Sequence, residues 1–332
     1  MKIVGDMHHQ KKLKDYRQTQ LILPGFFPGP AENYSSTIEL YDAIPKYIYQ
    51  KRFKRIEGRF LDPIQRNFVF RNESFCAKII PARVEVKKGE FKDFFPGLRE
   101  ELIEDALRKL IADGQSGVYL DDKVGAVFTL YQLQKELESM GHKYDIGQLK
   151  QGLFVCAGTR IKIESLSGNE VLEGSLFENI GLQTMEEWKG KGKKSRCFIR
   201  FNILVDKSIK QCTFRPLNYA ISMGYKNSLA RWLHKRMNHL YTQASWQNPY
   251  TITLSTIIRD SGRKRYAELR NNLREARKAL EEMQKKGILR EVIETPVREG
   301  RKLKDIKFKL IPGGLFIKEM KVINAKIKEA SK

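Results

Sequence analysis

The fold of this chain is decided by two neighbouring stretches, YKNSLARWLHKRMNHLY at residues 225–241 and YTITLSTIIRDSGRKRYAELRNNLREARKALEEMQKKG at residues 250–287. The first stretch predicts an amphipathic helix, because its hydrophobic residues recur every three or four positions. These residues are Leu229, Trp232, Leu233, Met237 and Leu240. Asn248-Pro249 ends the helical pattern, and the Thr/Ile run 250–253 predicts a short strand.

The second stretch continues as two helices joined by a tight turn. Ser255 is a suitable N-cap for a short helix that ends at Ser261-Gly262. A longer helix follows up to Gly287, with hydrophobic residues at alternating spacings of four and three: Leu269, Leu273, Ala276, Leu280 and Met283. This order of elements predicts a helix-turn-helix unit in which the long helix is the recognition element.

The polar side of the long helix points to a nucleic-acid partner. At about 100° per residue, Glu268, Glu275 and Glu282 fall on one flank and the cations fall on the other. The cationic flank consists of Arg263, Arg270, Arg274, Arg277 and Lys278. Separated charges favour binding to phosphates, whereas an ordinary solvated helix face is the alternative interpretation.

A basic hairpin follows this helix. Residues 288–294 and 305–310 predict two strands, and residues 295–304 are expected to form a loop between them. The loop carries Arg298, Arg301, Lys302 and Lys304. A basic loop beside a basic helix predicts the wing of a winged-helix domain.

Composition agrees with a polyanionic partner. The 332 residues include 62 Lys+Arg against 39 Asp+Glu, a net charge of +23. No apolar run reaches transmembrane length and no signal peptide is recognisable, so we expect a cytoplasmic protein of about two domains. The four cysteines are scattered without a close pair, so neither a metal site nor a disulfide framework is expected, and no cofactor is predicted.

The middle of the chain repeats the same plan. Residues 98–111 predict a helix, two strand-like runs and two shorter helices follow, and the segments 160–164 and 171–177 predict a hairpin. A Gly-spaced basic loop comes next, and its Lys191, Lys193 and Lys194 are further candidates for DNA contact. We interpret this region as a first winged-helix domain with an enlarged wing.

These observations define an α+β fold with two tandem winged-helix domains. The expected boundaries are an N-terminal arm or extension over residues 1–85, the first domain over 86–212, the second over 213–311 and a basic C-terminal tail over 312–332. Residues 21–30 hold three prolines and two glycines, which exclude a long helix there and favour an extended arm.

Signatures of catalysis are weak. The run at residues 190–195 lacks the four-residue gap and the preceding strand of a P-loop. His8-His9 has no convincing third metal ligand, and His234 and His239 are five residues apart rather than four. We therefore expect that the protein is not an enzyme.

Several motifs resemble those of bacterial plasmid replication initiator proteins that bind iterons. They are FRPLNY at 214–219, LARWLHKRM at 229–237, NPY at 248–250 and IIRDSG at 257–262, followed by EDALRKL at 104–110 and VFTLY at 127–131. The resemblance covers about residues 82–311 and implies two winged-helix domains that bind repeated sites in a plasmid origin. It assigns DNA contact most directly to Arg263, Lys264, Arg265, Arg270, Asn271 and Arg274.

The resemblance also implies a set of partners. These are the double-stranded DNA of plasmid origin repeats, the host initiator, the replicative helicase and a second copy of the chain in a monomer–dimer equilibrium. Three functions follow: an initiator that helps to open AT-rich DNA, a winged-helix transcriptional repressor, and a rolling-circle nickase with a tyrosine nucleophile such as Tyr266.

Overall fold

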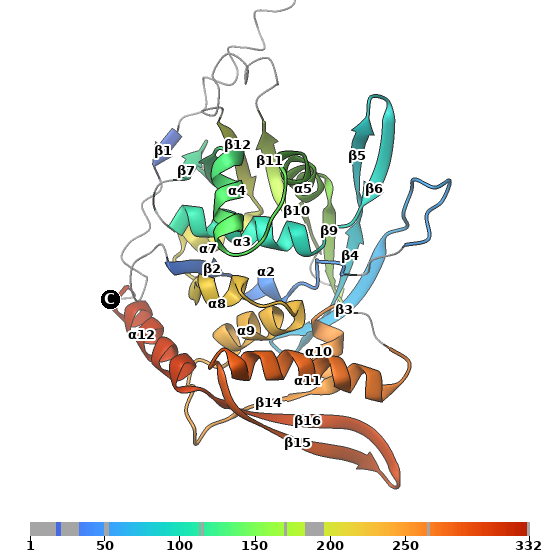
Figure 1. Cartoon of the computed structure of the whole chain (residues 1–332), viewed down its shortest axis with the longest axis vertical. Helices are drawn as coiled ribbons and strands as arrows, with labels where there is room; N and C mark the ends of the chain where they lie inside the picture. The colour runs from blue at the N-terminus through green and yellow to red at the C-terminus, as the bar shows by residue number, and fades with distance from the viewer. Residues whose placement is uncertain are drawn as a thin grey trace, which may run out of the picture.

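A computed structural model describes residues 18–20, 33–49, 53–112, 114, 116–168, 171–182, 196–263 and 266–330 (Figure 1). The chain has an α+β fold, as the sequence predicted. Its hydrophobic residues form two large cores, one on each side of a central helix. The proline-rich segment at 21–30 lies outside the described residues.

The C-terminal half follows the winged-helix order. Its elements are α9 (Ser228–Leu240), β14 (Tyr250–Thr253), α10 (Leu254–Asp260), α11 (Leu269–Lys285), β15 (Leu289–Glu299) and β16 (Lys302–Pro312). The three strands form an antiparallel sheet in the order β14-β16-β15. Ala276, Leu280 and Met283 of α11 are buried against this core, so the expected hydrophobic stripe is confirmed.

The ends of these helices follow local capping chemistry. The Asn227 side chain accepts a hydrogen bond from the Leu229 amide and begins α9. Thr253, not Ser255 as expected, caps α10, because its hydroxyl accepts from the Thr256 amide. The Ser255 hydroxyl instead donates to Asp305 at 2.5 Å. Gly287 has a φ of 74°, which explains why the helix α11 ends before it.

The residues expected to form a basic tail are instead an integral helix, α12 (Gly314–Ala330). Phe316, Met320 and Ile323 are buried in the C-terminal core, and Ile327 packs partly against both cores. The amide of Asn324 donates to the Thr242 carbonyl at 2.7 Å. The many lysines on the exposed side of this segment predicted a basic tail, although the spacing of its apolar residues is that of an amphipathic helix.

The N-terminal half keeps the expected helix order, but its strands from residue 98 onward belong to two different sheets. Its elements from residue 98 are α3 (Leu98–Ala112), β7 (Gly117–Leu120), β8 (Lys123–Phe128), α4 (Leu130–Ser139), α5 (Ile146–Gly158), β9 (Arg160–Ser165), β10 (Val171–Ser175), β11 (Phe177–Gly181), β12 (Cys197–Phe201) and α7 (Ile203–Lys210). The predicted strand 171–177 divides at the buried Leu176, so that β10 and β11 join different sheets. The β9–β10 hairpin pairs with β4 rather than with β8.

Residues 34–80 are not an arm. They form β2 (Tyr34–Thr37), α2 (Glu39–Ala43), β3 (Ile64–Phe70) and β4 (Glu73–Ile80), while β1 (Gln18–Gln20) pairs with β7. Phe75, Ala77 and Ile79 alternate inward along β4, and β2 pairs with β13 (Arg215–Asn218), which is followed by α8 (Tyr219–Met223). The N-terminal segment therefore links both halves of the molecule. A hairpin of β5 (Ala82–Lys87) and β6 (Glu90–Phe94) projects from the N-terminal half (Figure 1).

The remaining sequence expectations concern cysteines and membranes. Cys76, Cys156, Cys197 and Cys212 are all free thiols. Among the described residues, no helix combines the length and the hydropathy that crossing a bilayer requires.

Candidate nucleic-acid interface

The basic side of α11 is exposed to solvent. Its side chains retain large exposed fractions: 83% for Arg270, 63% for Arg274, 53% for Arg277 and 58% for Lys278. The opposite side of the helix is buried, so backbone geometry holds these four cations on one accessible surface. A helix with this exposure suits insertion into the major groove.

Each of these cations also has an acidic neighbour, which the helix pattern did not reveal. Arg270 pairs with Glu268 at 2.7 Å, and Glu275 accepts from Lys278 at 3.2 Å. Arg277 makes the strongest pair, because its Nε and Nη2 donate to both carboxylate oxygens of Glu294 on β15 at 2.8 and 2.6 Å. Exposed ion pairs stabilise a protein by only about 0.2–1 kcal/mol, so phosphates can displace such partners.

The turn before α11 is organised by a buried residue that the sequence analysis missed. Asn272 is 5% exposed, and its side chain accepts from the Tyr266 amide at 2.9 Å and donates to the Tyr266 carbonyl at 2.8 Å. This amide clamp fixes the entry into α11. The sequence does not indicate this role of Asn272, because an asparagine within a helix normally only weakens the helix.

One of the candidates at the start of α11 does not project as expected. Arg263 turns inward, with its guanidinium 3.5 Å from the centre of the Tyr49 ring, and burial lowers its pKa. The Asn271 amide donates to Glu268 at 3.1 Å. Arg263 is therefore held against the N-terminal half of the molecule rather than presented to a ligand, while Lys264 and Arg265 lie outside the described residues.

The wing is a ribbon, not the expected ten-residue loop. β15 and β16 pair as far as Glu299 and Lys302, and Gly300, with a φ of 59°, and Arg301 make a two-residue turn. The pairing of β15 with β16 continues past Glu294, although the side chains on both faces of the ribbon are exposed there. β-Branched residues in this segment favour the extended strand conformation. Exposed cations near the tip are Arg298, Arg301, Lys302 and Lys304, of which Lys304 pairs with Glu299.

The wing tip and the first turns of α11 lie toward the same end of the C-terminal half (Figure 1). β14 pairs with β16 only between Lys307 and Leu310, so the ribbon extends beyond the third strand. An exposed basic helix and a projecting basic ribbon thus form one continuous candidate interface, which we call the α11–wing surface. It comprises Arg270, Arg274, Arg277, Lys278, Arg298, Arg301, Lys302 and Lys304.

The N-terminal half does not repeat this charge pattern. Its corresponding helix α5 begins with a capping box at Asp145 and carries Lys150 as its only cation. Phe154, 45% exposed, lies on the solvent side of α5 instead. The basic loop with Lys191, Lys193 and Lys194 lies outside the described residues, between β11 and β12.

The central helix α9 is buried on two sides. Its Arg231 donates to Glu101 at 3.1 Å, and Lys235 donates to both oxygens of Asp105 at 2.7 and 2.8 Å, although these residues face α3 of the other half. Burial opposes the charge on Lys235, but Asp105 and Glu101 outweigh it and raise its pKa. These buried charged pairs therefore fix how α9 of the C-terminal half packs against α3 of the N-terminal half.

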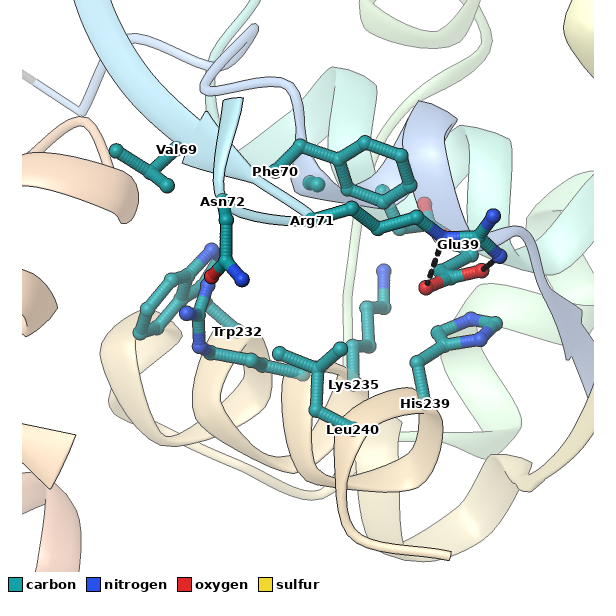
Figure 2. A pocket seen from close by; sticks show the side chains of 12 residues that line it. Glu39, Val69, Phe70, Arg71, Asn72, Trp232, Lys235, His239 and Leu240 are labelled. Atoms are coloured by element: carbon teal, nitrogen blue, oxygen red, sulfur yellow. Dashed lines mark hydrogen bonds and ion pairs between the residues drawn. The ribbon is translucent and has the colours of Figure 1, made fainter. Parts of the chain in front are cut away.

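A cavity of about 190 Å³ lies beside this junction (Figure 2). Trp232, Lys235 and His239 of α9 line one side, and the turn between β3 and β4 covers the other. Arg71 in that turn pairs with Glu39 at 2.6 Å, and burial lowers the pKa of His239 to about 4. The charges around the cavity are thus largely internally compensated, which indicates a structural junction.

No group of three or more His, Cys, Asp or Glu side chains in the described part of the chain is placed to hold a metal ion. Tyr266, the candidate nucleophile, lies in the turn before α11 and is 37% exposed. His8-His9 lies outside the described residues.

Comparisons with known proteins were informative only at the level of structure. Neither a protein-family model nor a curated protein matches the sequence. The structure is similar to domains 2 and 3 of RctB, with a TM-score of 0.51 and 8% identity over 82% of this chain and 96% of that one. A second structure of RctB domains 2–3 matches with a TM-score of 0.49, 11% identity and coverage of 86% and 99%. The Pi initiator protein in complex with iteron DNA matches with a TM-score of 0.43, 15% identity and coverage of 65% and 95%.

At 8% identity, the first of these likenesses concerns the fold. This chain therefore shares its α+β architecture with RctB domains 2 and 3 over most of its length.

Proposed function

We propose that this protein is a sequence-specific double-stranded DNA-binding protein that initiates plasmid replication by binding repeats in the origin. One observation carries the proposal: α11 exposes four cations beside a projecting basic ribbon, so a helix and a wing can engage the same duplex. The helix supplies base contacts in the major groove, and the wing supplies contacts to phosphates.

The initiator role, rather than DNA binding alone, is favoured by the motifs shared with plasmid initiators. Several of those motifs lie at the junction of the two halves: EDALRKL belongs to α3 and LARWLHKRM to α9. In this role the protein promotes opening of adjacent AT-rich DNA and brings the host initiator and helicase to the origin. A winged-helix repressor, which occupies an operator without opening DNA, is the second candidate.

Footprinting on the DNA that flanks the protein's own gene identifies the binding site. Permanganate reactivity of an AT-rich tract beside that site then separates the initiator from the repressor, because only the initiator makes thymines reactive. A covalent protein–DNA adduct would instead assign a nickase. A footprint without permanganate reactivity under any condition contradicts the initiator.

The stoichiometry of the complex is a separate part of the proposal. The sequence suggested that both halves act as DNA readers, yet α5 offers a single lysine. We propose that α11 and its wing provide the main sequence readout, while a second copy of the chain joins at an operator through the N-terminal half. The mass of the full-length protein bound to one repeat tests this: one chain per direct repeat is expected, and an obligatory dimer contradicts it.

A further inference from the structure

A groove runs along α12 at the end of the C-terminal half away from the wing. Two adjoining hollows of about 480 and 370 Å³ share Ser245 and Lys321. The groove lies between α12 and the loop 242–248 that joins α9 to β14. We call it the α12 groove.

The loop side of the groove presents an exposed aromatic side chain. Trp246 is 59% exposed, and the Arg290 guanidinium lies 5.7 Å from the centre of its ring. Tryptophan is enriched where one protein binds another, so an exposed tryptophan beside a hollow suits a binding site. Ile317 of α12 lines the same hollow, and the neighbouring Leu315 is 41% exposed.

The loop that carries Trp246 is held in place by hydrogen bonds. The Tyr241 hydroxyl donates to the Ser245 carbonyl at 3.0 Å, and the Asn248 amide donates to the Ser245 hydroxyl at 3.1 Å. Asn324 anchors the other end of the loop through the Thr242 carbonyl at 2.7 Å. A loop fixed in this way loses little conformational entropy on binding, so the loop side of the groove is organised before any partner arrives.

The helix side of the groove is positively charged. Lys318 and Lys321 are exposed, and neither makes an ion pair with another residue in the part of the chain that the structure describes. The four cations on the basic side of α11 differ, because each lies near a carboxylate. Two uncompensated lysines beside an apolar hollow are complementary to a partner that carries both negative charge and an apolar side chain.

Its position leaves the groove accessible when DNA is bound. α11 runs from the wing end of the domain toward α12, so the α12 groove and the wing tip lie at opposite ends (Figure 1). A partner in the groove would therefore not compete with DNA on the α11–wing surface.

We propose that the α12 groove binds an acidic segment of another protein, with an aromatic or branched apolar side chain packed against Trp246 and Ile317. Carboxylates that flank this anchor would pair with Lys318 and Lys321. A nucleic acid fits less well, because polyanion binding relies on several phosphate contacts and this concave surface offers two lysines among apolar groups. The use of the groove for recruiting replication proteins rests on the proposed function, whereas the binding site itself does not.

The test is a selection of peptides from a random twelve-residue library on the full-length protein. We expect enriched peptides to combine Asp or Glu with Phe, Trp, Leu or Ile. Their affinities are then measured by fluorescence anisotropy on Trp246→Ala and on Lys318→Glu/Lys321→Glu. Each variant should weaken binding roughly tenfold or more, which is the usual size of an interface anchor.

A matched control makes the same change in charge elsewhere on α12. Lys326→Glu/Lys328→Glu should weaken binding less than about twofold, because neither lysine lines the groove and Lys326 is already paired with Glu329. Footprinting of each variant on its DNA site shows whether the α11–wing surface is intact, so failure of this inference is distinguishable from failure of the proposed function.

Three results would overturn the inference. One is a selection without acidic, apolar-anchored sequences, and another is equal binding of the selected peptides to the groove variants and the control. The third is displacement of a selected peptide by a single-stranded oligonucleotide, with loss of oligonucleotide binding in Lys318→Glu/Lys321→Glu, which would assign the groove to nucleic acid.

Discussion

Replacing Glu294 by Gln should strengthen DNA binding. Glu294 on β15 holds Arg277 of α11 through two hydrogen bonds at 2.8 and 2.6 Å, so a phosphate must compete with this carboxylate. Glu294→Gln keeps the shape of the side chain and removes its charge. The charge of Arg277 at the α11–wing surface is then no longer compensated by the Glu294 carboxylate.

The size of the effect follows from counterion release. One additional phosphate contact steepens the slope of log K against log salt by about 0.9, which at 0.15 M salt corresponds to about fivefold tighter binding. The folded state should be destabilised by less than about 1 kcal/mol, since Arg277 is 53% exposed. Titrations by fluorescence anisotropy on the footprinted site, from 50 to 300 mM salt by design, measure the slope, and urea unfolding measures the stability.

Glu291→Gln is the matched control. Glu291 is exposed on the same strand, nearer α12, and makes no ion pair in the described part of the chain, so its replacement gives the same change in net charge. An unchanged slope for Glu294→Gln, or an equal increase for Glu291→Gln, would refute the assignment of Arg277 to a phosphate contact.

Four further predictions address the two ends of the interface and the junction. Arg274→Ala should cost about 1–3 kcal/mol on the specific site and much less on random duplex, and equal losses on both would reduce Arg274 to a phosphate contact. Arg301→Ala in the wing should weaken binding to the specific site and to random duplex alike, and should reduce the slope of log K against log salt by about 0.9. An unchanged slope would show that the wing tip makes no contact with phosphates. Asp105→Asn should lower the free energy of unfolding by about 3–5 kcal/mol, because it removes the carboxylate in closest contact with the buried Lys235 and leaves Glu101 at 3.8 Å. The double change Asp105→Leu/Lys235→Met should recover most of the loss in urea unfolding, and additive losses would contradict this reasoning. Burial lowers the pKa of His234 to about 3, against 6.5 in the unfolded chain. The contribution of neutral His234 to the free energy of unfolding is therefore complete above pH 6.5 and falls by up to about 1.4 kcal/mol per pH unit toward pH 3. His234→Leu should flatten that part of the pH–stability curve, and an unchanged curve would show that the folded histidine takes up protons freely.

The junction between the halves explains why these tests use the full chain. Asp105 and Lys235 are 130 residues apart in sequence, as are Glu101 and Arg231. A fragment that begins after residue 212 would expose Arg231 and Lys235 of α9 and lose the strand β2 that pairs with β13. Binding by such a fragment would therefore mix loss of contacts with loss of stability.

The sequence by itself determined the C-terminal half of the fold from α9 to β16, but not α12. The spacing of Leu269, Leu273, Ala276, Leu280 and Met283 defined α11, and Gly287 marked its end, because a helix repeats every 3.6 residues and a glycine accepts a positive φ. The alternation in β15 and β16 indicated the hairpin, although the sequence analysis placed a loop where the ladder continues. Such features depend on neighbours a few positions away.

The tertiary structure alone decided where the individual charges go. Arg263 belongs to the basic flank in sequence but lies on the ring of Tyr49, and Arg277 pairs with Glu294 seventeen positions away. The partner of a charged side chain is set by packing of distant segments, so no local period contains it. The same reason hid the burial of α9 against α3: a helix pattern shows which side is apolar, and only the assembled molecule shows which polar side is also covered.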